Sequence, residues 1–192
     1  MNNLKQKIEE CRLCPLYQTR NNVVFGEGAL DAPLMFIGEA PGAVEDETGR
    51  LFAGRSGQLM DNLLQTCGMS RTQHVYLTNI VRCRPPENRT PKKQEINACL
   101  PYLQRQIELI DPCIIVTLGA TALKSILKDN SLKVSKLRGS LVEHEGRKII
   151  PIYHPSALLR SPDLITDTRE DFKFISKTYR EQVNVEYSPL RF

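Results

Sequence analysis

The sequence predicts an α/β protein with three layers, an α/β/α sandwich around a central, mainly parallel four-stranded sheet. Two observations support this fold class: the chain contains four short, almost wholly apolar runs, and helical patterns alternate with them. Such runs are typical of buried parallel strands that are covered on both faces. The predicted strands lie at residues 33–38, 75–81, 114–118 and 148–153.

The helices are predicted from apolar residues that recur at helical spacing. Leu4, Ile8 and Cys11 indicate a short amphipathic helix at the start of the chain, which turns Cys11 inward. Later helices are marked by capping residues and by proline at a first helical position. They are expected from Ser56 to Gly68, from Thr90–Pro91 to Ile110, over 119–127 and over 169–179.

Length and composition indicate an ordinary globular protein. With 192 residues, 41% hydrophobic and 25% charged, the chain can bury a good core. We expect one domain over residues 4–181 and a tail over 182–192. No apolar run reaches the length of a membrane span, and the polar start Met1–Lys7 is unlike a secretory signal. We therefore expect a monomeric, cytoplasmic protein that does not associate with membranes.

Four of the six cysteines form a pattern typical of a metal centre. Cys11 and Cys14 make a CxxC at a helix end, Cys83 lies just past a strand, and Cys99 is on the inner face of the next helix. Four thiolates without histidine suit either tetrahedral zinc or an iron–sulfur cubane, and the spacing does not separate the two. Because cysteines in a reducing cytosol are seldom disulfides, we expect a structural centre that ties the amino-terminal helix to the middle of the chain.

Two segments far apart in the sequence are expected to form one pocket. Gly38–Gly42 follows the first predicted strand, and His154–Arg160 follows the last. In open α/β sheets, ligands bind outside the carboxyl ends of the strands, so both turns open toward the same crevice. The first turn contains the carboxylate of Glu39 and the second begins with the imidazole of His154. The sequence therefore predicts an active site here.

Basic residues gather in two places. One group surrounds the later cysteines, where it either offsets an anionic metal centre or forms a phosphate-binding loop. Its members are Arg82, Arg84, Arg89, Lys92 and Lys93. Arg55 and Ser56 lie within Gly54–Gly57 at a predicted helix start, where exposed backbone N–H groups favour an anion.

Several short motifs stand out when the chain is taken as a whole. They are Gly38–Gly42, Glu45–Asp46, Leu51–Gly57, Leu77–Asn79, His154–Ser156 and the cysteines Cys11, Cys14, Cys83 and Cys99. Together these motifs resemble the family 4 uracil-DNA glycosylases, the iron–sulfur members of the uracil-DNA glycosylase superfamily, and the resemblance covers about residues 4–180. It implies a [4Fe-4S] cluster on the four cysteines. It also implies hydrolysis of the N-glycosidic bond of deoxyuridine in DNA, which releases uracil and leaves an abasic site for base excision repair.

The resemblance and the residue chemistry together assign roles in the pocket. His154 is expected to hydrogen-bond uracil O2 as negative charge develops on the leaving base. Asn79 offers an acceptor for N3–H and a donor for O4, a pattern that cytosine reverses. Phe52 is expected to stack on the pyrimidine ring, although a place in the core is the alternative.

Further roles concern the methyl group of thymine and the attacking water. By resemblance, Glu45 lies near uracil C5 and excludes that methyl group, while Gly38 and Ala40 belong to the turn that contacts uracil. Ala40 stands where the best-known branch of the superfamily has an aspartate. We therefore expect Glu39, the nearest carboxylate, to position water or to balance the sugar cation.

Contacts to DNA are expected from both basic sites and from the segment after His154. Leu158 and Leu159 are predicted to form an apolar wedge that fills the gap in the base stack, and Arg160 to bind phosphate. The alternative is a short helix that packs its leucines inward. The other predicted DNA contacts are Arg55, Ser56, Arg84, Arg89 and Ser156.

Other functions stay open at this point. A uracil-DNA cross-linking protein of the same superfamily carries an inserted basic loop with a histidine, and residues 82–91 contain no histidine. A non-catalytic iron–sulfur module would bind normal and uracil DNA alike. A nucleotide hydrolase is disfavoured because the Gly38–Gly42 turn lacks the Lys-Ser/Thr of a P-loop. The tail Glu186–Phe192 faintly resembles motifs that dock on DNA sliding clamps; disorder is the alternative.

Overall fold

The computed structural model describes residues 1–183 and has a six-stranded sheet at its centre. The strand order is β1-β3-β2-β4-β6-β5, and the four inner strands are parallel. These inner strands are the apolar runs that the sequence predicts, and the α/β class is confirmed. They are β2 (Leu34–Gly38), β3 (Val75–Asn79), β4 (Ile114–Leu118) and β6 (Arg147–Ile152).

The sheet has two more strands than the sequence predicts. β1 (Glu27–Gly28) pairs antiparallel with β3, and β5 (Val142–His144) pairs antiparallel with β6. Both are short edge strands without a continuous apolar run, so the pattern that marks a buried strand is missing from them. Glu145 and Gly146, both with positive φ, form the two-residue turn between β5 and β6.

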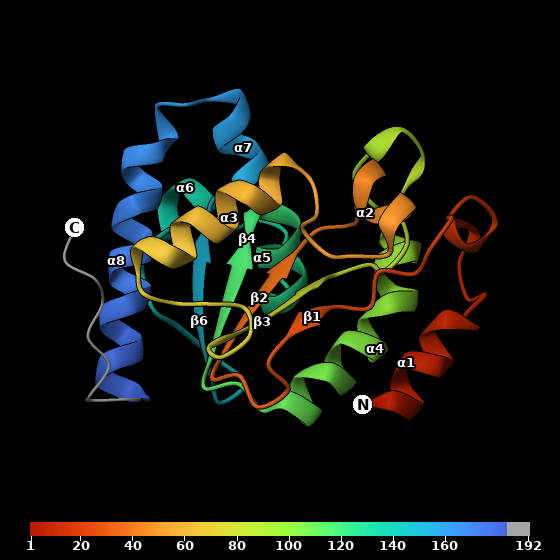
Figure 1. The fold of residues 1–192 in the computed structure, drawn as a ribbon, viewed down its shortest axis with the longest axis horizontal. Helices are drawn as coiled ribbons and strands as arrows, with labels where there is room; N and C mark the ends of the chain where they lie inside the picture. The colour runs from red at the N-terminus through yellow and green to blue at the C-terminus, as the bar shows by residue number, and fades with distance from the viewer. Residues whose placement is uncertain (184–192) are drawn as a thin grey trace.

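Helices cover both faces of the sheet, as expected for three layers. Leu34 and Phe36 of β2 pack with α3, α7 and α8, whereas Met35 and Ile37 pack with α4 and α5. In Figure 1, α3 crosses in front of the sheet and α5 lies behind it. These helices are α3 (Arg55–Thr66), α4 (Lys93–Ile110), α5 (Gly119–Leu127), α7 (Pro155–Arg160) and α8 (Leu164–Gln182).

Some helix starts differ from the predicted caps. Gly54, not Ser56, is the N-cap of α3, and Lys92, not Thr90, is the N-cap of α4. Glu95 explains the second shift, because its Oε2 accepts the backbone N–H of Lys92 at 2.7 Å.

None of the helices within residues 1–183 is long and apolar enough to cross a membrane. The remaining short helices are α1 (Asn2–Glu9), α2 (Ala43–Thr48), α6 (Val134–Leu137), and the 3₁₀ turns Pro15–Gln18 and Pro86–Asn88.

The amino-terminal segment lies against α4 and α2. Leu4 and Ile8 of α1 form a small core with Phe25. The buried carboxylate of Asp46 accepts the backbone N–H of Asn21 at 3.0 Å, and its other oxygen accepts the Asn21 side-chain amide at 2.9 Å. This contact holds the loop that follows the first two cysteines beside the helix that contains Glu45.

Candidate active site

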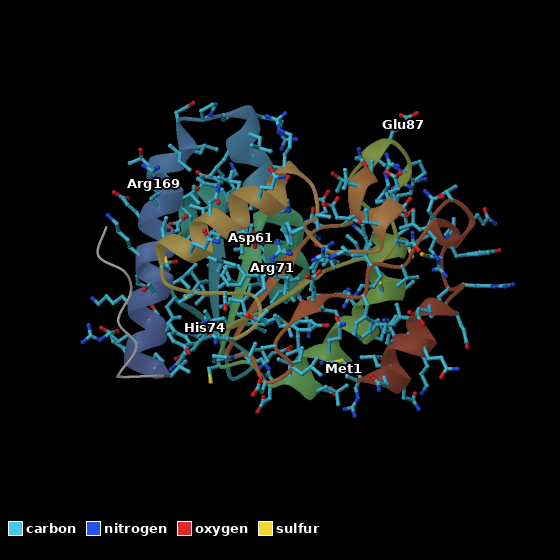
Figure 2. The ribbon with its side chains drawn as sticks, in the orientation of Figure 1. Met1, Asp61, Arg71, His74, Glu87 and Arg169 are labelled. Atoms are coloured by element: carbon cyan, nitrogen blue, oxygen red, sulfur yellow. The ribbon has the colours of Figure 1, made fainter. Side chains whose placement is uncertain are left out.

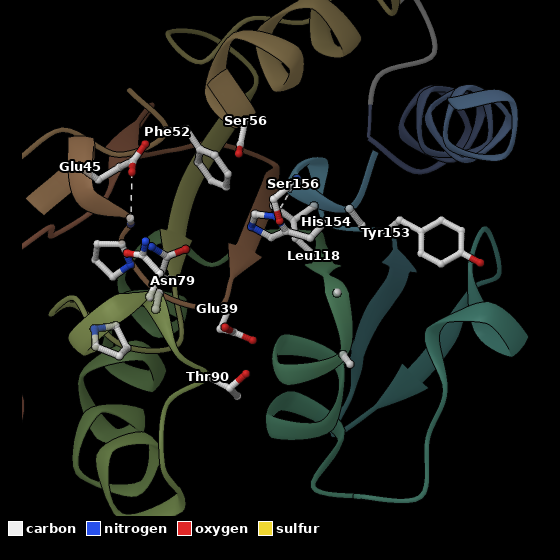
Figure 3. A pocket seen from close by; sticks show the side chains of 18 of the residues that line it. Glu39, Glu45, Phe52, Ser56, Asn79, Thr90, Leu118, Tyr153, His154 and Ser156 are labelled. Carbon is white, nitrogen blue, oxygen red and sulfur yellow. Dashed lines mark hydrogen bonds between the residues drawn. The ribbon is translucent and has the colours of Figure 1, made fainter. Parts of the chain in front are cut away.

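A cavity of about 700 Å³ opens where the parallel strands end. Residues from the Gly38–Gly42 turn, from the end of β3 and from the start of α7 all line it. In Figure 3, Asn79 and His154 lie on opposite sides of this cavity, with Phe52 above them and Glu39 below. The structure therefore brings together the two turns that the sequence singled out.

Because Gly38 has no side chain, a space stays open between the amide of Asn79 and the imidazole of His154. Gly38 is the last residue of β2 and pairs with Asn79, the last residue of β3. A Cβ at position 38 would lie 2.4 Å from Asn79 Oδ1 and 3.5 Å from His154 Nε2. Asn79 is only 3% exposed, so its amide is held in a largely dry place. A flat ring that enters this space meets both polar groups.

His154 is fixed in one tautomer. It is the N-cap of α7, and its Nδ1 accepts the backbone N–H of Ser156 at 3.1 Å. A backbone N–H can only donate, so Nδ1 carries a lone pair and the neutral ring has its proton on Nε2. Burial lowers the pKa of His154 from 6.5 to about 4, and the charge of Arg160 adds to this effect. At neutral pH, His154 is therefore an uncharged donor at the pocket.

Phe52 stacks against His154 from a loop with unusual backbone geometry. The two ring centroids are 5.9 Å apart, with 28° between the planes. Phe52 has a φ of +50°, a conformation that is uncommon for a bulky residue. A Cβ on Gly57 would lie 1.6 Å from the carbonyl oxygen of Phe52, so the first turn of α3 closes tightly under this loop.

Arg71 holds the same loop from the other side, and sequence reasoning missed it. Its guanidinium donates to the carbonyl oxygens of Leu51 at 2.8 Å and Phe52 at 3.1 Å. Asp61 fixes the guanidinium through an ion pair of 2.6 Å, and Figure 2 shows the two side chains together. No local signal in the sequence marks this pair, because Arg71 is twenty residues away from the loop that it supports.

Glu39 has one side-chain partner that the sequence did not predict. The hydroxyl of Thr121 on α5 donates to Glu39 Oε2. Glu39 directly follows β2, and Figure 3 shows its carboxylate in the lower part of the pocket, near Thr90. A weak signal was available, since Thr121 follows a strand whose carboxyl end opens on the same pocket.

Glu45 lines the cavity, but its carboxylate already has two partners. Oε1 accepts the backbone N–H of Gly54 at 2.9 Å, and Oε2 accepts that of Gly42 at 3.1 Å. Glu45 thus ties the start of α2 to the start of α3. Ala40 also lines the cavity.

Four of the six polar residues predicted to contact DNA line the cavity. Ser56, Arg89, Ser156 and Arg160 line the mouth or wall of the cavity, and Arg55 is exposed at the start of α3. Two of the arginines are engaged within the chain. Arg84 donates to Asn88 at 2.7 Å, and Arg89 forms a bidentate ion pair with the buried Glu95 at 2.7 and 2.9 Å.

The two leucines of the predicted wedge have different surroundings. Leu158 is 4% exposed and packs in the core beside α3 and α8. Leu159 is 42% exposed. A leucine buried in the core cannot enter a base stack without unpacking α7. Leu158 therefore fits the alternative of a leucine packed inward, and Leu159 is the exposed leucine of the pair.

The four cysteines of the predicted centre line one second cavity, together with Arg20 and Arg82. Arg20 Nη1 lies 3.2 Å from the sulfur of Cys83. Burial raises the pKa of the Cys83 thiol to about 11 and also raises that of Cys14 and Cys99. Within residues 1–183, no group of three or more His, Cys, Asp or Glu side chains is arranged to hold a metal ion.

The comparison with known families decides the classification. The family model described as "Uracil DNA glycosylase superfamily" matches residues 25–181. The chain belongs to this superfamily. The superfamily match begins after Cys11 and Cys14. The prediction that these two residues belong to a metal centre therefore depends on the cysteine pattern and on the cavity that all four cysteines line.

Among superfamily relatives, a type-4 uracil-DNA glycosylase from Thermotoga maritima is 46% identical over 82% of this chain and 82% of its own length. Another, from Sulfurisphaera tokodaii, is 44% identical over 90% of this chain and 81% of its own. A crystal structure of SMUG2 from Pedobacter heparinus matches with a TM-score of 0.52 and 11% identity. The match covers 81% of this chain and 76% of the SMUG2 chain, and at this identity it supports the fold alone.

Proposed function

We propose that this chain is an iron–sulfur uracil-DNA glycosylase, which hydrolyses the N-glycosidic bond of deoxyuridine in DNA and acts in base excision repair. The observation that carries the proposal is the space beside Gly38, where the Asn79 amide and His154 Nε2 face one cavity under Phe52. Five curated relatives named type-4 uracil-DNA glycosylases, 40–46% identical to this chain, agree with it.

Recognition of uracil rests on the amide of Asn79. A base inside a duplex cannot be reached, so the nucleotide has to be extruded into the pocket. There Asn79 accepts from uracil N3–H and donates to O4, while Phe52 stacks on the ring. Cytosine presents an acceptor at N3 and a donor at N4, so the buried amide would stay unpaired. The carboxylate of Glu45, braced by two backbone N–H groups, is our proposed barrier to the methyl group of thymine.

Release of the base rests on His154. Cleavage leaves negative charge on uracil and positive charge on the sugar. The Nε2–H of the neutral imidazole donates to O2 as this negative charge develops, and such a fixed donor contributes about 3 kcal/mol. The lowered pKa is suited to this role, because the ring stays a neutral donor and does not protonate the base outright.

The water step is assigned to Glu39. Its carboxylate either orients the water that attacks the sugar carbon or balances the charge of the sugar. Thr121 is then a positioning residue, because its hydroxyl fixes one carboxylate oxygen and leaves the other for water.

Two substitutions test this assignment. We expect Glu39→Gln to lower kcat by about 100-fold, within the range for loss of a positioned base. Thr121→Val, which keeps the shape but removes the donor, should lower kcat about tenfold with little change in KM. Single-turnover release of uracil measures both. If Glu39→Gln keeps wild-type turnover, another group orients the water.

The four cysteines are proposed to hold a [4Fe-4S] cluster. The proposal rests on donor chemistry and not on ligand geometry: four sulfur donors line one cavity beside two arginines, as an anionic thiolate-bound group requires. When bound, the iron supplies the positive charge that buried thiols need in order to lose their protons. The cysteines then tie the segment after α1 to β3 and α4. Measurement of iron, acid-labile sulfide and visible absorption in anaerobically purified protein tests this proposal.

For the DNA interface we propose that Leu159 fills the gap in the base stack and that six polar residues contact the DNA backbone. These six are Arg55, Ser56, Arg84, Arg89, Ser156 and Arg160. Leu159→Ala should reduce base extrusion about tenfold, because the unstacked step loses its apolar filler. A fluorescent base analogue opposite uracil reports it.

The matched control is Leu158→Ala. We expect it to lower stability by about 2–5 kcal/mol through a core cavity, while extrusion by the folded fraction stays normal. Normal extrusion in Leu159→Ala would contradict the wedge.

One assay tests the whole function. Protein is incubated with an oligonucleotide that contains a single uracil, and alkali then cleaves any abasic site. We expect strand cleavage and free uracil, and neither with cytosine in the same position. Binding without an abasic product would favour a non-catalytic module. A shifted protein–DNA band on a denaturing gel would favour the cross-linking protein.

Three other expectations remain proposals: a monomer, a cytoplasmic location and docking of the tail on a sliding clamp. The tail segment 186–192 lies outside the described residues. Its deletion should abolish clamp binding if the motif is used, and leave uracil release unchanged.

A further inference from the structure

Arg82 is a buried arginine between the cysteine cavity and the uracil pocket. It is only 1% exposed, directly precedes Cys83 and lines the cavity of the four cysteines. A guanidinium is costly to bury unless its donors are satisfied. Its place in the fold therefore needs an explanation that ordinary packing does not give.

The guanidinium of Arg82 joins the end of β3 to α4. Nη1 donates to the carbonyl oxygen of Asn79 and, at 3.2 Å, to that of Ile80. Nη2 donates to the side-chain oxygen of Gln106, which is fully buried on α4. Gln106 also accepts the hydroxyl of Thr78 at 3.0 Å. The guanidinium thus joins α4, the helix of Cys99, to the strand end that carries the uracil-recognising amide.

One nitrogen of the Arg82 guanidinium is without a partner. Its Nε is buried and has no hydrogen-bond partner among the described residues. A buried donor without a partner destabilises the folded state, so a partner is expected. The sulfur-lined cavity beside it holds the candidate acceptors. Arg82 lines this cavity together with Cys83 and Cys99.

We propose that Arg82 is a positioning residue that links the cluster to the uracil pocket: its Nε–H donates to the thiolate-bound cluster while Nη1 holds the carbonyl of Asn79. This inference rests on the proposed function. It gives the cluster a consequence beyond anchoring the amino terminus, because loss of the cluster removes one end of the brace behind Asn79.

The chain offers a matched control in Arg20. Arg20 also contacts a predicted cluster ligand, with Nη1 3.2 Å from Cys83 Sγ, but its other bond goes to the carbonyl of Glu9, away from the uracil pocket. Arg82→Lys and Arg20→Lys both keep the charge and remove the planar fork. They are compared as anaerobically purified proteins of equal iron content. Arg82→Gln replaces Arg82→Lys if the lysine variant does not fold.

Three measurements separate the two arginines: the midpoint potential of the cluster, the uracil-release kinetics and the hydrogen exchange of two backbone amides. These amides belong to Ile80 and Val81, which donate to the carbonyls of Gly38 at 2.8 Å and Glu39 at 3.1 Å. They report directly on how firmly the end of β3 holds the Gly38–Gly42 turn.

We expect both variants to lower the midpoint potential, because loss of a donor to sulfur destabilises the more negative reduced state. Arg82→Lys alone should lower kcat/KM by about 10- to 100-fold, the effect of a misplaced recognition group, and should narrow the preference for uracil over cytosine. It should also speed exchange at Ile80 and Val81, and removal of the cluster from the wild-type protein should do the same.

An unchanged potential in Arg82→Lys, or wild-type exchange and kinetics in that variant, would overturn the link. Equal losses of activity in Arg20→Lys and Arg82→Lys would also overturn it, since general destabilisation would then explain both. Absence of uracil release by the wild-type protein is a different failure: it refutes the proposed function, while the potential and the exchange data still decide whether Arg82 connects the cluster to β3.

Discussion

His154→Ala is expected to lower kcat on uracil-containing DNA by about 100- to 1000-fold, the cost of removing one fixed donor to a developing anion. The effect should appear in kcat and leave KM nearly unchanged, because the bond from Nε2–H strengthens only as the base departs. Single-turnover rates and the affinity for uncleaved DNA separate these quantities. If His154→Ala raises KM and leaves kcat unchanged, His154 binds the base without assisting its release.

The lowered pKa of His154 also predicts how stability depends on pH. The folded pKa is about 4 and the unfolded value is 6.5, so the unfolded chain binds the proton more tightly. Stability contributed by the neutral ring is complete above pH 6.5 and falls as the pH drops from 6.5 toward 4. Thermal unfolding across this window should show a steeper decline for the wild-type protein than for His154→Asn, which has no titrating group. Parallel curves would contradict the assignment.

Asn79→Asp is expected to lower kcat/KM for uracil by about 1000-fold. The substitution keeps the size of the side chain but replaces the N–H donor with a second acceptor, which faces uracil O4. The hydrogen bond to O4 is lost while the one from N3–H remains. The lost bond and the two buried acceptors that now face each other cost about 1–3 kcal/mol each, and each 1.36 kcal/mol is worth a factor of about ten. The ratio of uracil to cytosine release should fall by a similar factor.

Binding to DNA that already contains an abasic site provides the control for Asn79. The base is absent from that ligand, so its affinity should be the same for the wild-type protein and Asn79→Asp. A variant that still prefers uracil to cytosine as strongly as the wild type would place recognition elsewhere in the pocket. If Asn79→Asp binds uracil-containing DNA and abasic DNA more weakly by the same factor, the substitution has damaged the fold of β3.

How far prediction from sequence succeeded can be judged from particular residues. The inner strands were found because a strand buried on both faces needs an unbroken apolar run, and Leu34–Gly38 and Ile114–Leu118 supply one. The edge strands were missed because Glu27–Gly28 and Val142–His144 have only one neighbour and no such requirement. Asn79 and His154 could be placed at the pocket because each ends or follows a run of this kind.

Supporting residues could not be found in the same way. Thr121, Arg71 and Arg82 act through contacts with carboxylate or carbonyl oxygens. For Thr121 and Arg71 these oxygens are brought near only by the fold. Leu158 and Leu159 are adjacent and chemically identical, yet one is in the core and the other faces solvent. Which leucine is buried depends on the rotation of α7 about its axis, and that is set by its packing on α3 and α8.

By itself, the sequence determined the strand-and-helix alternation, the two turns at the strand ends, the cysteine pattern and the membership that these imply. Such features are local: period, spacing and residue type express them within a few positions. Only the tertiary structure decided the tautomer and the lowered pKa of His154, and the hydrogen bonds by which Glu45 ties α2 to α3. It also decided the support of the Phe52 loop by Arg71 and the place of Arg82 beside the cysteine cavity. Each of these depends on burial, or on an oxygen or nitrogen whose position is fixed only when the chain has folded.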